Sequence, residues 1–199
     1  MSVHRFRADE LPAVPWKNGG GTTRQVACWP PGAGFDDFEW RVSVADIATS
    51  GPFSAFPGVD RHILLLSGDG MRLRAGDGGF DHRLAVPLVP FAFSGDVAVQ
   101  SDMLGGVSSD FNVMARRGRC RALVRVIDDV RELDASAHGL LMVAAGAWRA
   151  NGEALGVGSG LWWAREPLAW RLVPTESRAK IIAVSFSEVE ENRRRQRSE

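Results

Sequence analysis

The segment Phe38-Glu39-Trp40-Arg41-Val42-Ser43-Val44 alternates strictly between apolar and polar residues. Successive side chains of a β-strand point to opposite faces, so this alternation predicts a strand with one apolar face. That face would hold Phe38, Trp40, Val42 and Val44. If it packs against the core between two sheets, the polar residues Arg41 and Ser43 face a pocket or solvent.

The rest of the chain repeats this kind of signal. Short apolar runs recur at near-even spacing, each ended by Gly, Pro, Asp or Asn, and helical periodicity is scarce. The Asp-Gly pair within residues 67–70 and the pair Asn151-Gly152 both predict hairpin turns. Two prolines break the apolar run 84–93, which places it at a strand edge or in an extended loop.

This pattern predicts an all-β, antiparallel fold of the barrel or sandwich type. The signals follow a two-part rhythm, which predicts two such units packed together in one chain. The first unit would span residues 1–118 and the second residues 119–187, followed by a charged, flexible tail at 188–199. Only residues 128–137 are a candidate for a short helix.

The composition excludes several classes of partner. The 199 residues carry no net charge, so nothing favours nucleic acid or a membrane surface, and the basic run 193–197 is interpreted as a solvated tail. Cys28 and Cys120 are far apart, and the N-terminus lacks an apolar signal core. No apolar run is long enough to span a membrane. We therefore expect a cytoplasmic protein that binds neither nucleic acid nor membranes.

The segment Pro15-Trp16-Lys17-Asn18-Gly19-Gly20-Gly21-Thr22-Thr23-Arg24 places an aromatic ring, an ammonium and a carboxamide beside three glycines. Glycine lets the backbone come close to a bound molecule. Lys17 and Lys180 are the only lysines, so a compact ammonium stands here in a chain whose common cation is arginine. Two interpretations remain open: a ligand contact, or a surface turn with one exposed lysine.

Four motifs occur in a distinctive order along the chain. The segment 15–24 is followed by Trp40-Arg41-Val42-Ser43-Val44-Ala45, then by Gly51-Pro52-Phe53-Ser54-Ala55-Phe56-Pro57-Gly58-Val59-Asp60-Arg61, and later by Asp110-Phe111-Asn112-Val113-Met114-Ala115-Arg116-Arg117-Gly118. In this order the motifs resemble the HutD/Ves family, and the resemblance covers nearly the whole chain.

The resemblance implies a bicupin, with two small antiparallel β-barrels of the jelly-roll type and the motifs concentrated in the N-terminal barrel. It also implies a regulatory protein of histidine utilisation, without assigned catalysis, that binds a small metabolite of that pathway. Gln25 departs from the family pattern, because many relatives carry Glu after the Thr-Thr-Arg run. No role for an acid is therefore assigned to this position.

The residues do not favour a metal or a cofactor. Cupin barrels usually bind a metal through two histidines one residue apart, a glutamate and a later histidine, but this chain has no His-x-His. Its histidines share no ligand spacing: His4, His62, His82 and His138. Ser54 lies outside a nucleophile elbow, and Lys17 precedes the glycines that a phosphate loop would place before its lysine.

The remaining polar residues suit a small organic anion. Three arginines of the motifs can bind a carboxylate through charge-assisted hydrogen bonds, and Lys17 adds a point charge. Asparagine amides can contact an amide or imidazole edge, while aromatic rings exclude water. The predicted ligand-binding set is Trp16, Lys17, Asn18, Arg41, Ser43, Phe53, Ser54, Phe56, Arg61, Asn112, Met114 and Arg116.

These residues also have ordinary structural alternatives. Arg41 or Arg61 can form a salt bridge with a nearby acid, such as Asp46 or Asp60. Asn112 can cap a turn, and the two phenylalanines can belong to the core. Four tryptophans of the second half favour core and inter-barrel packing over a second aromatic site: Trp148, Trp162, Trp163 and Trp170.

Three functions follow from these observations. The first is a non-catalytic sensor whose N-terminal barrel binds a small carboxylate of histidine breakdown, namely urocanate, formiminoglutamate or formylglutamate, and modulates histidine utilisation. The alternative is a metal-independent cupin enzyme, an isomerase or hydrolase of a small organic acid, with Asp60, Asp110 or Lys17 as acid or base. The third is a protein-interaction module in which exposed tryptophans form a homodimer face.

Overall fold

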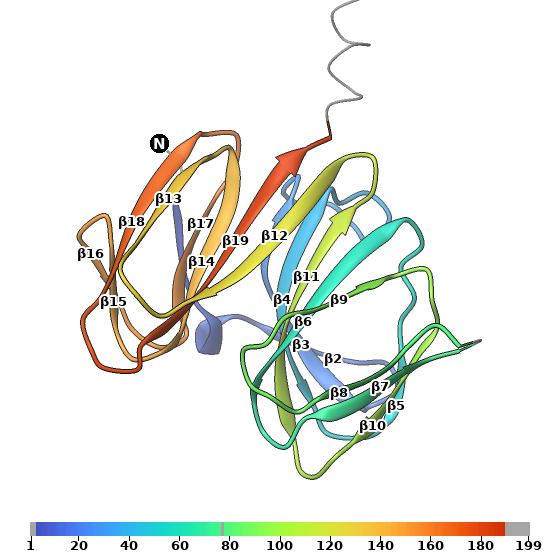
Figure 1. Ribbon diagram of the computed structural model, residues 1–199. Coiled ribbons are helices and arrows are strands. Elements are labelled where there is room, and N and C mark those ends of the chain that lie inside the picture. Colours follow the sequence, from blue (N-terminus) through green and yellow to red (C-terminus); the bar gives the residue numbers. More distant parts are fainter. Residues whose placement is uncertain (1–2, 77, 190–199) are drawn as a thin grey trace, which may run out of the picture. The chain divides into compact units, whose positions relative to one another are not determined.

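The computed structural model describes residues 3–76 and 78–189, and these residues form an all-β fold (Figure 1). Their only helix is a short 3-10 turn, η1 (Ala8–Glu10). No helix among them is long and apolar enough to cross a membrane. The described residues divide into two compact units, one within residues 12–117 and the other within residues 118–189 together with residues 3–11.

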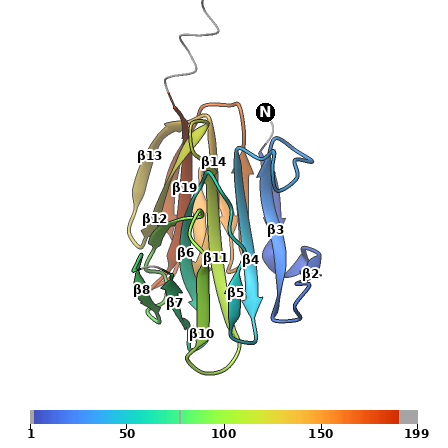
Figure 2. The same ribbon diagram turned by 90° about the vertical axis from the view of Figure 1, so that its right-hand side faces the viewer.

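The N-terminal unit contains one sheet of six strands and one of four, and all paired strands are antiparallel. Figure 2 shows the central strands of the larger sheet side by side. In order across that sheet, the strands are β2 (Ala13–Pro15), β3 (Gly21–Trp29), β4 (Trp40–Ile47), β11 (Ser108–Arg116), β6 (Val59–Ser67) and β9 (Phe91–Ser94). The smaller sheet holds β5 (Gly51–Phe53), β10 (Val99–Met103), β7 (Met71–Ala75) and β8 (Asp81–Leu84).

The C-terminal unit is also built from two sheets. Its five-stranded sheet runs in the order β1 (His4–Arg7), β17 (Ser159–Trp163), β14 (His138–Ala145), β19 (Lys180–Glu188) and β12 (Cys120–Ile127). Its four-stranded sheet runs in the order β13 (Arg131–Ser136), β18 (Leu168–Pro174), β15 (Trp148–Ala150) and β16 (Glu153–Leu155). In each unit, one apolar cluster joins side chains from both sheets, so each unit is a sandwich with its own core.

The prediction of an all-β fold is confirmed, but the structure differs from the finer predictions in two respects. In the part of the chain that the structure describes, no sheet closes into a barrel, since every sheet has two open edges. The N-terminal segment belongs to the C-terminal unit, because β1 pairs with β17 and Phe6 lies opposite Gly160. Strand β19 extends to Glu188, and the rest of the predicted tail, from residue 190, lies outside the described residues.

Of the local predictions for turns, a helix and a broken strand, some are confirmed and others are wrong. Asn151-Gly152 joins the paired strands β15 and β16 with positive φ at both residues, so this hairpin is confirmed. The turn at 67–70 is not a hairpin, because β6 and β7 that flank it belong to different sheets. The predicted helix at 128–137 is wrong: β13 forms there and pairs with β18. The run 84–93 is a loop that leads into the edge strand β9, as predicted.

One face of β4 points into the core between the two sheets of the N-terminal unit. Ala45 and Ile47 belong to the apolar cluster that joins both sheets. Because the faces of a strand alternate, Arg41 and Ser43 lie on the same inward face. The other face of β4 is buried as well, through Trp40, Val42 and Val44. The core between the sheets therefore lies on the side opposite to the one that the sequence pattern assigned to it.

The turn between β6 and β7 depends on glycine. Gly70 has φ +84°, and a Cβ there would lie 2.1 Å from the carbonyl oxygen of Leu84. Gly78 has a similar φ of +74° in the same unit, but a Cβ there would meet nothing within 4 Å. The two positions share the backbone constraint and differ in the space around them.

We predict that Gly70→Ala lowers the free energy of unfolding by at least about 3 kcal/mol, through left-handed strain plus a backbone clash. Gly78→Ala should cost only the strain, about 1–2 kcal/mol. Urea unfolding of both variants beside the parent protein measures the difference. Equal losses for the two variants would contradict the close packing of this turn.

Candidate functional site

Polar side chains gather inside the N-terminal sandwich, on three neighbouring strands. Residues directly opposite each other in a sheet point to the same face, so the register of β4, β11 and β6 decides what faces the core. Three successive rows across these strands are Arg41–Met114–Arg61, Ser43–Asn112–Ile63 and Ala45–Asp110–Leu65. Since Ala45, Ile63 and Leu65 belong to the inter-sheet core, the polar members of these rows also point inward.

Arg61 is the most deeply buried cation of this group, with 5% of its surface exposed. Its guanidinium carbon lies 4.9, 5.4 and 5.7 Å from the ring centroids of Phe93, Phe56 and Phe53. Nη1 donates a hydrogen bond to the carbonyl oxygen of Ser54 at 3.2 Å, whereas Nε has no acceptor among the described residues. Burial lowers the pKa of Arg61 to about 10, although the carboxylate of Asp110 opposes this shift.

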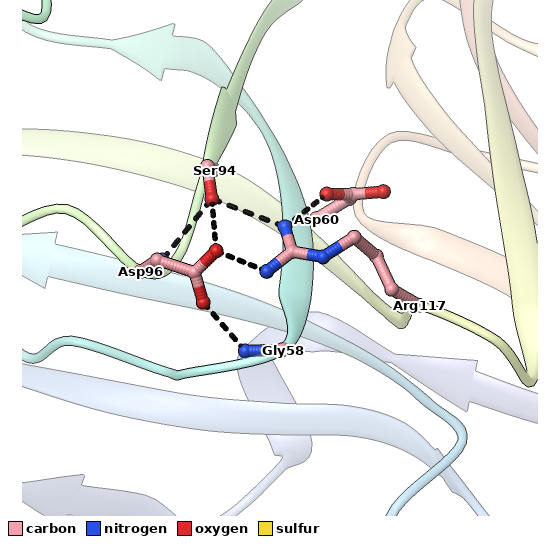
Figure 3. A network of polar contacts seen from close by, with 5 residues as sticks. All are labelled: Gly58, Asp60, Ser94, Asp96 and Arg117. Atoms are coloured by element: carbon pink, nitrogen blue, oxygen red, sulfur yellow. Dashed lines mark hydrogen bonds and ion pairs between the residues drawn. The ribbon is translucent and has the colours of Figure 1, made fainter.

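The acids that were alternative partners for the arginines are engaged elsewhere. Asp46 forms an ion pair with Arg24, with 2.5 Å between Oδ2 and Nη1. Asp60 pairs with Nη1 of Arg117 at 2.7 Å, within a network that also contains Ser94 and Asp96 (Figure 3). Neither Arg41 nor Arg61 has a carboxylate within 4.0 Å among residues 3–76 and 78–189. The salt-bridge alternative is therefore wrong for both arginines.

Asp110 and Asn112 stand two residues apart on β11 and face the same interior. Asp110 is 2% exposed, and its pKa is raised to about 7, mainly by burial and further by Asp46, while Arg61 lowers it. Asn112 is 8% exposed, and its Oδ1 is a buried acceptor without a donor in the described structure. Asn112 lies in the middle of a strand, so it does not cap a turn.

Arg41 lies at the more open end of the same face. Its Nε donates to Oε1 of Gln25 at 2.9 Å, and its guanidinium stacks over the ring of Phe35, 4.6 Å from the centroid. Partial burial lowers the pKa of Arg41. Phe35 contacts Phe56 at 5.7 Å between centroids and is itself 60% exposed. Gln25 thus supplies a neutral acceptor where a glutamate would neutralise the arginine, which leaves the positive charge of Arg41 uncompensated.

Several predicted residues have structural roles at the edge of this group. Arg116 donates from Nε to the carbonyl oxygen of Phe38 at 2.8 Å and from Nη2 to that of Phe35 at 3.2 Å, so it fixes the loop that precedes β4. Met114 is 3% exposed and packs with Phe38 in a small apolar cluster. Ser54 is exposed and contributes its backbone carbonyl to Arg61 rather than its hydroxyl.

The residues of the glycine-rich motif divide between core and surface. Trp16 is half-buried, donates from Nε1 to Oγ1 of Thr23 at 2.7 Å and contacts the edge of Phe53. Lys17 and Asn18 are exposed on the following turn, and Oδ1 of Asn18 accepts a hydrogen bond from the backbone of Gly20 at 3.0 Å. The structure therefore brings Trp16 to the aromatic wall and leaves Lys17 and Asn18 on the surface turn.

Three residues that the structure brings to this group are missing from the predicted ligand-binding set: Gln25, Phe93 and Asp110. Asp110 had been considered only as an acid or base in the enzyme alternative. Its spacing of two from Asn112 within a predicted strand places both on one face, and this signal was available in the sequence. Phe93 could not be found this way, because its contact with Arg61 depends on the pairing of β9 with β6. No group of three or more His, Cys, Asp or Glu residues suited to a metal occurs among the described residues.

The fold and this site define a class of protein: two β-sandwich units in one chain, the first with a buried cation and an unsatisfied amide inside. The family model described as HutD matches residues 8–181. The chain therefore belongs to the HutD family, and the resemblance found in the four motifs is confirmed.

Known relatives agree with this assignment. Protein Ves of Cronobacter sakazakii is 38% identical over 185 residues, which cover 92% of this chain and 97% of the relative. The structure of HutD from Pseudomonas fluorescens SBW25 in a formate condition has a TM-score of 0.84 and 31% identity, and the match covers 94% of this chain and all of that one. The Escherichia coli protein Ylba has a TM-score of 0.65 at 9% identity, covering 93% of this chain and 90% of that chain, and shows the fold alone.

The buried carboxyl of Asp110 predicts a specific pH dependence. Its pKa in the folded protein, about 7, is above the unfolded value of 3.8, so the folded state retains a proton that the unfolded state has already lost. Stability should therefore fall as pH rises from about 4 to about 7, and Asp110→Asn should remove that loss.

We expect Asp110→Asn to raise the free energy of unfolding above about pH 7 by an amount on the order of a few kcal/mol, and to change little below about pH 4. Denaturant unfolding across this pH range measures the effect. Asp102→Asn, which removes a partly exposed carboxylate from the same unit, is the control for loss of one charge. A gain that is the same at every pH would contradict the assignment.

Proposed function

We propose that this chain is a bicupin of the HutD family whose N-terminal unit binds a small carboxylate of histidine degradation in the cytoplasm, without catalysis, and thereby modulates histidine utilisation. Candidate ligands are urocanate, formiminoglutamate and formylglutamate. The observation that carries the proposal is Arg61, a guanidinium inside the sandwich that forms no ion pair within 4.0 Å among the described residues.

Asp110 stabilises the charge of Arg61 only in part and forms no ion pair with it within 4.0 Å, so the buried guanidinium remains costly. A carboxylate that enters the site would reduce this cost. The Nε of Arg61 supplies an unused donor, and each charge-assisted hydrogen bond contributes about 1.5–3 kcal/mol. The three phenylalanine rings around the guanidinium exclude water, which strengthens the interaction. A carboxylate is also the chemical class of formate, in whose presence the Pseudomonas fluorescens relative was studied.

Asn112 narrows the choice of ligand. Its Oδ1 is a buried acceptor without a donor in the described structure, so the ligand is expected to carry an N–H group beside its carboxylate. A formylamino group, a formimino group and an imidazole ring each supply one. Ser43, directly opposite Asn112 in the register and 3% exposed, supports this polar position.

We predict that one of these three carboxylates binds the parent protein and that Arg61→Met weakens its binding at least about tenfold, the loss of one charge-assisted hydrogen bond. Isothermal titration calorimetry measures the affinity, with thermal unfolding as a check that the variant is folded. Arg72→Met removes an exposed arginine of β7 that pairs with Asp81 of β8, and it should leave binding unchanged. No heat with any of the three compounds on folded protein would reject the proposal.

A second function has one specific observation in its favour. Asp110 is buried beside the same site with a pKa of about 7, which suits a group that donates and accepts protons near neutral pH. The alternative is therefore a metal-independent cupin enzyme, an isomerase or hydrolase of a small organic acid.

If this alternative holds, incubation with the bound carboxylate converts it to a product visible by NMR, and Asp110→Asn abolishes conversion while binding persists. Asp102→Asn should retain full conversion, because this side chain lies on β10 of the smaller sheet. Recovery of unchanged ligand after prolonged incubation with the parent protein would exclude the enzyme and leave the binding function in place.

A further inference from the structure

A cavity of about 440 Å³ lies within the C-terminal unit and is lined by residues of both its sheets. This size is within the range of sites that hold small molecules, roughly 300–1,000 Å³. Leu123, on the edge strand β12, lines the cavity and is 47% exposed, so the cavity opens to solvent along that strand. None of its lining residues belongs to the site around Arg61.

The cavity exists because small residues occupy the middle of one row across the five-stranded sheet. That row is Leu123–Ser185–Gly139–Trp163, on β12, β19, β14 and β17. A Cβ on Gly139 would lie 2.3 Å from the ring of Trp163, so the indole lies directly against the backbone of β14. Ala183, two residues before Ser185 on the same face, is also small. These side chains leave the inward face of the sheet hollow.

Two tryptophans form the aromatic side of the cavity. The ring centroids of Trp163 and Trp170 are 5.2 Å apart, with an interplanar angle of 46°. Trp163 is fixed, because its Nε1 donates to the carbonyl oxygen of Ser136 at 2.8 Å. Trp170 is 7% exposed, and its Nε1 has no acceptor within the described ranges. The wall thus offers flat apolar surface and one buried donor that an acceptor atom would satisfy.

Charges of both signs line the same cavity, and a second acid, Glu188 at the end of β19, also lines it but is already engaged in another interaction. Arg125 extends from β12, and Asp134 lies on β13 where the pairing with β18 is irregular. Both are exposed, and neither forms an ion pair with another described residue. A ligand with only a negative charge would be repelled by Asp134. A ligand with only a positive charge would be repelled by Arg125. A ligand that carries one charge of each sign matches the two lining charges that form no ion pair, Arg125 and Asp134.

We propose that the C-terminal unit binds a free, zwitterionic α-amino acid with a flat side chain. The carboxylate of the ligand pairs with Arg125, its ammonium group with Asp134, and its side chain lies against Trp163 and Trp170. The hydroxyl of Ser185, on the hollow face, is within the lining and supplies a further hydrogen bond. This site is separate from the proposed carboxylate site and does not depend on it.

The test uses calorimetric titration of the full chain with L-phenylalanine, L-tryptophan and L-histidine. At least one should bind saturably with a Kd below about 1 mM. The neutral N-acetyl amide of the same amino acid should bind at least about tenfold more weakly, because it lacks both charges. An equal affinity for the neutral compound, or no saturable binding of any of the three, would overturn the proposal.

Variants locate the binding. Arg125→Met and Asp134→Asn should each weaken binding about tenfold or more, whereas Arg171→Met, on the outward face of β18 beside the buried Trp170, should not. Ser185→Phe fills the hollow and should abolish binding; near-UV circular dichroism and thermal unfolding confirm that it folds. Arg61→Met must leave amino-acid binding intact, and loss of binding there would assign the amino acid to the N-terminal site and overturn the proposal.

Discussion

The structure of the N-terminal unit depends on a charge that is held inside a β-sandwich. Arg61 lies on the inward face of β6, in the same row as Arg41 and Met114, and three phenylalanine rings surround its guanidinium. Aromatic faces stabilise a cation only in part, and one backbone carbonyl does not supply a counter-charge. The interior of this unit therefore does not fully compensate the charged and polar groups that it contains. Asp110 and Asn112 show this as well. One takes up a proton near neutral pH and the other retains an unused acceptor.

The two units use the same plan of two antiparallel sheets and arrive at different interiors. In the N-terminal unit, the inward face of the larger sheet carries polar and charged groups in three adjacent rows. In the C-terminal unit, the corresponding layer carries Gly139, Ala183 and Ser185, whose small size leaves room beside Trp163 and Trp170. The interior of the N-terminal unit offers a ligand charged and polar groups without close partners, and the interior of the C-terminal unit offers it open volume. This difference is why we assign them different ligands.

Alternation along the strands grouped the polar candidate residues on one face, whereas no such pattern grouped the candidates on turns. Arg41, Ser43 and Asn112 alternate along their strands, and the structure places all three on the inward face. Lys17 and Asn18 were included because of their chemistry, yet they lie exposed on the turn after Trp16. A turn has no period, so its sequence does not indicate which side chains point inward. The position of a turn residue depends on the elements that flank it.

Alternation and turn chemistry by themselves determined that the chain forms antiparallel strands, that Asn151-Gly152 closes a hairpin, and that the motif strands present polar residues on one face. These features depend on residues close together in sequence. Tertiary structure alone decided that β1 joins the distant strand β17, that the turn at 67–70 connects two sheets, and that Asp60 pairs with Arg117 and not with Arg61. Each of these results from competition between long-range partners. A local sequence pattern does not indicate which distant strand or side chain becomes the partner, because that choice depends on how the sheets pack.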